Sequence, residues 1–143
     1  MTQKIIFSFI VLATAVFVGC SNNVQLRGKV TYSDDGLPLE VGTVCFAKDN
    51  SMSSGVIQSD GTYVLGTLKG SDGIPPGTYS VYVIGADIIK QIGTDDNFTE
   101  TTVLLIDSKY ASPDSSEITC VVDRTTKTFD FQVGRRGAVA PEH

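Results

Sequence analysis

Short runs in which apolar and polar residues alternate, each ending at a glycine or proline turn, constrain the fold of this chain most strongly. In residues 26–32, Leu26, Gly28, Val30 and Tyr32 alternate with polar side chains. A period of two places every second side chain on one face of a sheet, so such a run predicts a half-buried β-strand. We expect strands at residues 26–32, 41–47, 56–59, 62–65, 78–84, 117–123 and 126–133, and a strand or an edge segment at 101–106. This spacing predicts an all-β, antiparallel sandwich of about seven strands.

The segments between these runs carry turn and loop composition. Asp60 and Gly61 separate two β-rich runs and predict a hairpin there, because glycine accepts the positive φ of a tight turn. Residues 48–54 are small and polar, which predicts a loop, and residues 95–97 have loop composition too. Residues 86–92 are compatible with one or two turns of helix.

The segment before Cys20 has the parts of a bacterial lipoprotein signal peptide. Lys4 supplies a positive charge, residues 5–18 are almost entirely apolar, and Gly19 is small enough for cleavage just before Cys20. The apolar run is shorter than the ~20 residues that a membrane-spanning helix needs. An uncleaved anchor and a packed segment are the alternatives. Because Phe17 stands where such signals usually carry leucine, ordinary signal-peptide cleavage nearby also remains open.

This interpretation divides the chain into four parts. Residues 1–19 are the signal peptide, 20–23 a lipidated tether, 24–134 the sandwich and 135–143 a loose tail. Acyl chains on Cys20 would hold the protein to a membrane, and Ser21 after it favours the outer over the inner membrane by resemblance to Gram-negative lipoproteins.

Charge and cysteine content limit the partners. The chain has 16 acidic and 11 basic residues and no basic cluster, which argues against nucleic acid and leaves membrane attachment to the lipid. Cys45 and Cys120 form a candidate disulfide in an exported protein. The strand pattern disfavours this bridge, because it turns Cys45 outward while Cys120 lies on an inward row.

Several motifs resemble, in order and spacing, those of a carboxypeptidase regulatory-like domain, which is a transthyretin-like β-sandwich. The matching segments are residues 28–32, 36–39, 42–46, 59–63 and 76–81. Residues 109–113 and 127–131 resemble the closing part of small lipoproteins found in planctomycete-type bacteria. The resemblance covers residues 24–133 and implies a single transthyretin-like sandwich.

Catalytic chemistry finds little support in the sequence. The only histidine is His143, the last residue, and Cys45 and Cys120 have no metal-ligand spacing. We therefore expect no enzyme activity and no cofactor, although sequence alone leaves a paired-carboxylate site open. Asp residues in turns, such as Asp34 and Asp35, make calcium a minority hypothesis, against which stands the ordinary turn-capping role of aspartate.

These observations lead to two hypotheses about function, from different classes of protein. The first is a non-enzymatic, lipid-anchored envelope protein that acts as a structural or adhesion module through exposed loops such as residues 85–107. The second is a small binding module for carbohydrate, peptide or calcium. An envelope protein or a glycan would be the partner, and the sequence names neither.

Overall fold

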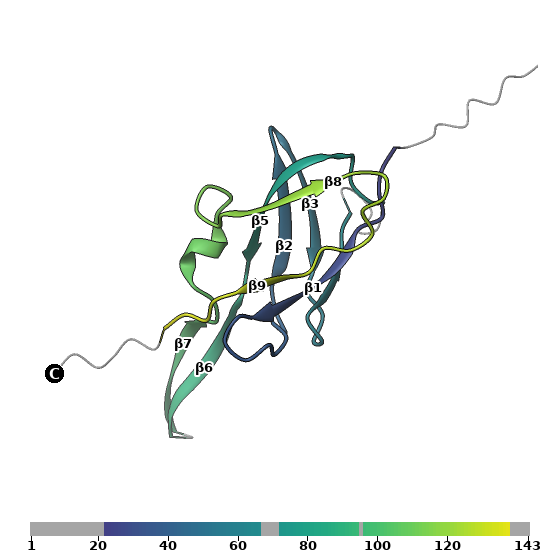
Figure 1. Ribbon diagram of the computed structural model, residues 1–143. Coiled ribbons are helices and arrows are strands. Elements are labelled where there is room, and N and C mark those ends of the chain that lie inside the picture. The colour runs from purple at the N-terminus through teal and green to yellow at the C-terminus, as the bar shows by residue number, and fades with distance from the viewer. Residues whose placement is uncertain (1–21, 67–71, 95, 138–143) are drawn as a thin grey trace, which may run out of the picture.

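The alternating runs build two stacked sheets in the computed structural model, which describes residues 22–66, 72–94 and 96–137 (Figure 1). One sheet has the order β4-β1-β9, with β1 at Arg27–Tyr32, β4 at Thr62–Val64 and β9 at Phe131–Val133. The other has the order β3-β2-β5-β8, with strands at Ser51–Val56, Thr43–Lys48, Gly77–Ile84 and Ile118–Val122 respectively. The predicted all-β sandwich is confirmed, and its two layers hold seven strands.

The core lies between the sheets and is rich in aromatic rings. Phe46 from β2 is central, with its ring centroid 5.9 Å from that of Phe129 and 6.1 Å from that of Tyr79. Tyr63 and Phe131 meet edge to face at 6.2 Å. The buried residues Val30 and Tyr32 confirm the inward row of the first run, and Tyr79, Val81 and Val83 confirm that of β5.

Gly28 lets two segments approach closely within this core. A Cβ at Gly28 would lie 2.7 Å from the Tyr63 hydroxyl oxygen and closer still to the carbonyl oxygen of Phe129. The space that glycine leaves is used by a hydrogen bond in which Tyr63 Oη donates to that carbonyl oxygen at 2.5 Å. Tyr63 thereby fastens the segment before β9 to the three-stranded sheet.

The predicted loop at residues 48–54 is wrong, because β3 occupies most of it. Only Asp49 and Asn50 connect β2 to β3, since Lys48 and Ser51 are already paired across the strands. Asp49 has a positive φ of 50°, as two-residue hairpins require and as aspartate tolerates. The polar composition of β3 gives no strand signal in the sequence, and the segment is extended because it pairs with β2.

The hairpin predicted at Asp60 and Gly61 forms in part: the Gln58 amide donates to the Thr62 carbonyl at 2.8 Å, and Ser54 and Gly66 form an isolated antiparallel bridge. Gly61 has a φ of 83° and its amide donates to the Gln58 carbonyl at 2.8 Å. The strands on either side, however, enter different sheets: β3 pairs with β2, whereas β4 pairs antiparallel with β1. The turn therefore carries the chain from one layer of the sandwich to the other.

The helical turns considered at residues 86–92 do not form. This segment is β6 (Asp87–Thr94), which pairs antiparallel along its whole length with β7 (Asn97–Leu104). The two strands form a separate two-stranded ribbon that projects from the sandwich (Figure 1). We call β6 and β7 together the arm.

The end of the chain departs from a purely antiparallel arrangement. β9 pairs with β1 in parallel, with Val30 opposite Phe131. It spans three residues rather than the predicted 126–133, although Thr128 still forms an isolated bridge with Arg27. A single turn of 3-10 helix, η1 (Ser108–Ala111), links the arm to the strands that follow, and Asp107 caps it by accepting from the Lys109 amide.

Candidate functional site

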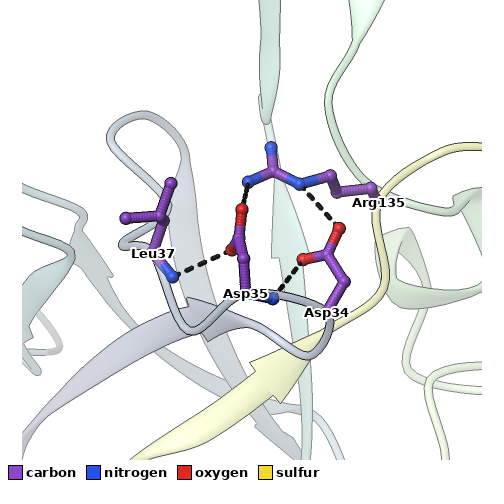
Figure 2. Close-up of polar contacts among 4 residues, drawn as sticks. All are labelled: Asp34, Asp35, Leu37 and Arg135. Carbon is purple, nitrogen blue, oxygen red and sulfur yellow. Dashed lines mark hydrogen bonds and ion pairs between the residues drawn. The ribbon is translucent and has the colours of Figure 1, made fainter.

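The most organised polar cluster joins the loop after β1 to the chain after β9. Arg135 Nε lies 2.9 Å from Asp34 Oδ2, and Arg135 Nη2 lies 2.7 Å from Asp35 Oδ2 (Figure 2). The guanidinium carbon sits 3.5 Å from the centroid of the Tyr32 ring, which is cation–π geometry. We call Tyr32, Asp34, Asp35 and Arg135 the latch.

The loop is shaped to offer both carboxylates to one cation. Asp34 Oδ1 accepts from the Asp35 amide at 2.9 Å, and Asp35 Oδ1 accepts from the Leu37 amide at 2.9 Å (Figure 2). Gly36 supports this turn with a φ of 71°. Each carboxylate therefore uses one oxygen to hold its own loop and the other to bind Arg135.

The expectation of a loose tail from residue 135 is wrong for Arg135 itself. Besides its ion pairs, Arg135 forms an isolated antiparallel bridge with Ile106, and the Arg136 amide donates to Leu105 at 3.2 Å. The chain is thus fastened to the base of the arm beyond β9. Sequence reasoning missed this role because Arg135 lies 100 residues from Asp35, and no local pattern pairs them.

The pKa values of three latch groups shift in directions that follow from hydrogen bonding, burial and neighbouring charge. The backbone hydrogen bond from Leu37 lowers the pKa of Asp35, and the bond from Arg135 lowers it further. The bond to Asp35 raises the pKa of Arg135. Burial raises the pKa of Tyr32, although the nearby Arg135 charge opposes that shift. At neutral pH, Asp35 is therefore ionised, Arg135 is protonated and Tyr32 is neutral.

A shallow cleft of about 470 Å³ adjoins the latch. It is lined by Tyr32, Leu37, Pro38, Glu40, Val41, Ile88, Leu105 and Arg135. The carboxylates of Glu40, Asp34 and Asp35 outnumber the one guanidinium here, so the surroundings are acidic. Such a cleft suits a neutral or cationic group better than an anion.

The predicted lipidation residue Cys20 lies outside the described residues. Cys45 and Cys120 are both buried and both free. Cys45 is opposite Tyr82 in the register, and Cys120 is opposite Tyr79, so the two thiols point to different faces of the four-stranded sheet with β5 between them. The structure therefore does not join this candidate pair. Burial raises the pKa of both thiols, that of Cys120 to about 11.

Three of the turn aspartates, Asp34, Asp35 and Asp60, already bind other groups of the protein. Asp34 and Asp35 face Arg135, and Asp60 accepts from both the amide and the hydroxyl of Thr62. Within residues 22–66, 72–94 and 96–137, no group of three or more His, Cys, Asp or Glu side chains is placed to hold a metal ion. In the same ranges, no helix is long and apolar enough to cross a membrane.

The arm is the second notable surface. Nearly all of its residues are exposed, and the exposed fractions reach 67% for Ile89, 60% for Ile92 and 51% for Phe98. Register places Ile88, Ile92 and Val103 on one face of the ribbon and Ile89, Phe98 and Leu104 on the other. Both faces are therefore partly apolar and open to solvent.

Comparison with known proteins assigns this chain to no family. No protein-family model and no curated protein matches the sequence. The structure is similar to that of BcpA*(D312A), the major pilin subunit of Bacillus cereus, with 14% identity and a TM-score of 0.46 over 80% of this chain and 30% of that chain. It is also similar to a 9R-lipoxygenase from Cyanothece PCC8801, with 15% identity and a TM-score of 0.34 over 78% of this chain and 16% of that chain. This chain thus spans less than a third of either protein, and likenesses so distant carry no argument about function.

Proposed function

We propose that this protein is a non-enzymatic, lipid-anchored envelope protein whose sandwich serves as a structural or adhesion-type module. The signal-peptide pattern before Cys20 supports export and acylation at that residue, and Ser21 after it supports the outer rather than the inner membrane. Only three residues separate Cys20 from the isolated bridge at Val24, so the anchor would hold the sandwich close to the bilayer.

The arm is the observation that carries this proposal. An isolated two-stranded ribbon is marginally stable in water, and exposed apolar surface of this kind marks interaction sites. The arm projects from the end of the sandwich away from the start of the described chain (Figure 1). A protein tethered at its N-terminus would thus present the arm away from the membrane.

We further propose that the sandwich is of the transthyretin-like, carboxypeptidase regulatory-like type. The two-layer arrangement of seven strands supports this, as do the positive φ angles at Gly36 and Gly61 in two of the matching motifs. The arm, which the matching motifs do not cover, lies outside the two layers of seven strands.

Two measurements test the proposed function. Mass spectrometry of the mature protein is expected to find an acylated N-terminal Cys20, and a free N-terminus at another residue would refute the anchor. Beads coated with the protein are expected to bind isolated cell envelopes of the source bacterium. Ile89→Ser with Phe98→Ser should abolish this binding, whereas Val121→Ser, an equally exposed apolar residue on the sandwich, should not. Equal binding by the arm variant would refute the adhesion role.

The cleft beside the latch favours a second candidate, a binding module for carbohydrate, peptide or calcium. Its aromatic wall at Tyr32 and its excess of carboxylates suit sugar hydroxyls or a cation. A glycan array and melting curves with and without calcium test this. Binding that Tyr32→Ala removes would favour this candidate, and no ligand or calcium-dependent shift would exclude it.

A further inference from the structure

The arm has two open strand edges. Among the described residues, β6 and β7 pair only with each other, and the Leu105 amide just beyond β7 continues this pairing by donating to the Ala86 carbonyl at 2.9 Å. Each strand therefore presents a row of unpaired backbone groups on its outer side. Such an edge is a template for adding another strand.

Neither edge has strong protection against pairing. Residues 87–94 and 97–104 contain no proline, and β7 carries one charge, that of Glu100. Natural sheets usually shield exposed edges with proline, bulges or several charges. The unprotected edge thus favours a partner strand as occupant.

The sequence of β7 is complementary to itself in one antiparallel register. A twofold axis through Thr101 would place Phe98 opposite Leu104 of a second copy and Thr99 opposite Val103 of that copy. Glu100 would then face Thr102, and Thr101 would face its own counterpart. The twofold symmetry repeats the apolar pair of Phe98 and Leu104, so each dimer contains it twice. No like charges lie opposite each other in this register.

Other symmetric pairings are poorer. An axis through Glu100 sets two carboxylates against each other, and an axis through Lys90 of β6 does the same with two ammonium groups. An axis through Gln91 sets Lys90 against Ile92. Like charges directly opposite each other destabilise a sheet, which disfavours the Glu100 and Lys90 axes, whereas the Thr101 register of β7 avoids such contacts and also sets Phe98 against Leu104.

We propose that two copies of this chain pair through β7, antiparallel and centred on Thr101, to form a four-stranded sheet from two arms. This inference rests on the proposed role of the arm as a contact surface and names its partner as a second copy. The paired sheet closes both β7 edges and leaves one face with Phe98 and Leu104 of both chains in contact. The sandwiches would extend from opposite ends of this sheet, which suits a bridge between two tethered molecules.

Cysteine cross-linking tests the register. The full chain carrying Cys20→Ser, in a nonionic detergent, leaves only the buried Cys45 and Cys120 as native thiols. Thr101→Cys should give a covalent dimer under mild oxidation, because directly opposite residues satisfy the geometry of a disulfide. Thr102→Cys is the matched control and should stay monomeric, because its counterpart would be too far away to bridge.

A second measurement does not depend on cross-linking. Sedimentation of the Cys20→Ser chain should show a concentration-dependent dimer, and Phe98→Ser should raise its dissociation constant by roughly tenfold, since each dimer loses two cross-strand pairs. Unchanged association in Phe98→Ser, a chain that stays monomeric at all concentrations, or equal cross-linking of the two cysteine variants would overturn the inference.

These outcomes separate the inference from the proposed function. If Thr101→Cys stays monomeric while Ile89→Ser with Phe98→Ser still abolishes envelope binding, the arm contacts a different partner and only the self-pairing fails. If the arm variant binds envelopes as the parent does, the proposed function fails as well.

Discussion

Gly28→Ala offers the sharpest test of how the core is assembled. The added Cβ would meet the Tyr63 hydroxyl at 2.7 Å and the Phe129 carbonyl oxygen more closely, whereas contacts under 3.0 Å essentially never occur at real Cβ atoms. One of the two neighbours is backbone, so a rotamer change alone cannot relieve the clash. The segment before β9 must move away from β1, which strains the hydrogen bond that Tyr63 Oη of β4 donates to the Phe129 carbonyl oxygen.

The expected cost follows from these two effects. Overpacking a close-packed core costs about 1–3 kcal/mol, and a weakened hydrogen bond adds about 1 kcal/mol. With a urea dependence of ~2 kcal/mol/M for a domain of this size, a loss of about 2–4 kcal/mol lowers the unfolding midpoint by about 1–2 M. The slope itself should not change, because the same surface is exposed on unfolding.

Urea unfolding followed by tyrosine fluorescence measures this midpoint, since the chain has five tyrosines and no tryptophan. Gly137→Ala is the matched control: a Cβ there meets nothing within 4 Å, and its midpoint should stay at the parent value. If Gly28→Ala unfolds at the same urea concentration as Gly137→Ala, the close approach of β1 to the Phe129 carbonyl is wrong.

Three further predictions concern single groups. Tyr63→Phe should cost about 1–2 kcal/mol of unfolding free energy by urea titration, because the Phe129 carbonyl loses its donor; a cost near zero would mean that water replaces the hydroxyl. Arg135→Gln should slightly lower the melting temperature at neutral pH, with Arg136→Gln as control. Because the pKa of Asp35 is lowered from 3.8 in the folded chain, its contribution is fully present above pH 3.8 and is lost as the pH falls through the folded value, so the two variants should converge there. A difference between the two variants that persists once Asp35 is protonated would contradict the ion pair. Neither Cys45 nor Cys120 should react with a thiol reagent at pH 8 in the native Cys20→Ser chain, and both should react in urea, since burial raises the pKa of each thiol; rapid native labelling would show that one of them is accessible.

The sequence by itself determined the all-β class and the inward rows of its main strands. Alternation of apolar and polar residues has a direct physical reading, because successive side chains of a strand point to opposite faces. It therefore identified Val30 and Tyr32 in β1, and Tyr79, Val81 and Val83 in β5, as core residues. The turns at Gly36 and Gly61 were equally local, since they depend on the conformational freedom of single residues.

Only the tertiary structure decided which strands pair, and this pairing formed both the latch and the arm. β3 is too polar to be recognised without its partner β2, and the Asp60 turn leads between sheets because β4 finds β1. Pairing between neighbouring strands turned residues 87–94 and 97–104 into an arm, and long-range contacts brought Arg135 onto Asp34 and Asp35. These contacts join residues up to about a hundred positions apart, where no local propensity acts, so packing and charge in the folded chain had to select them.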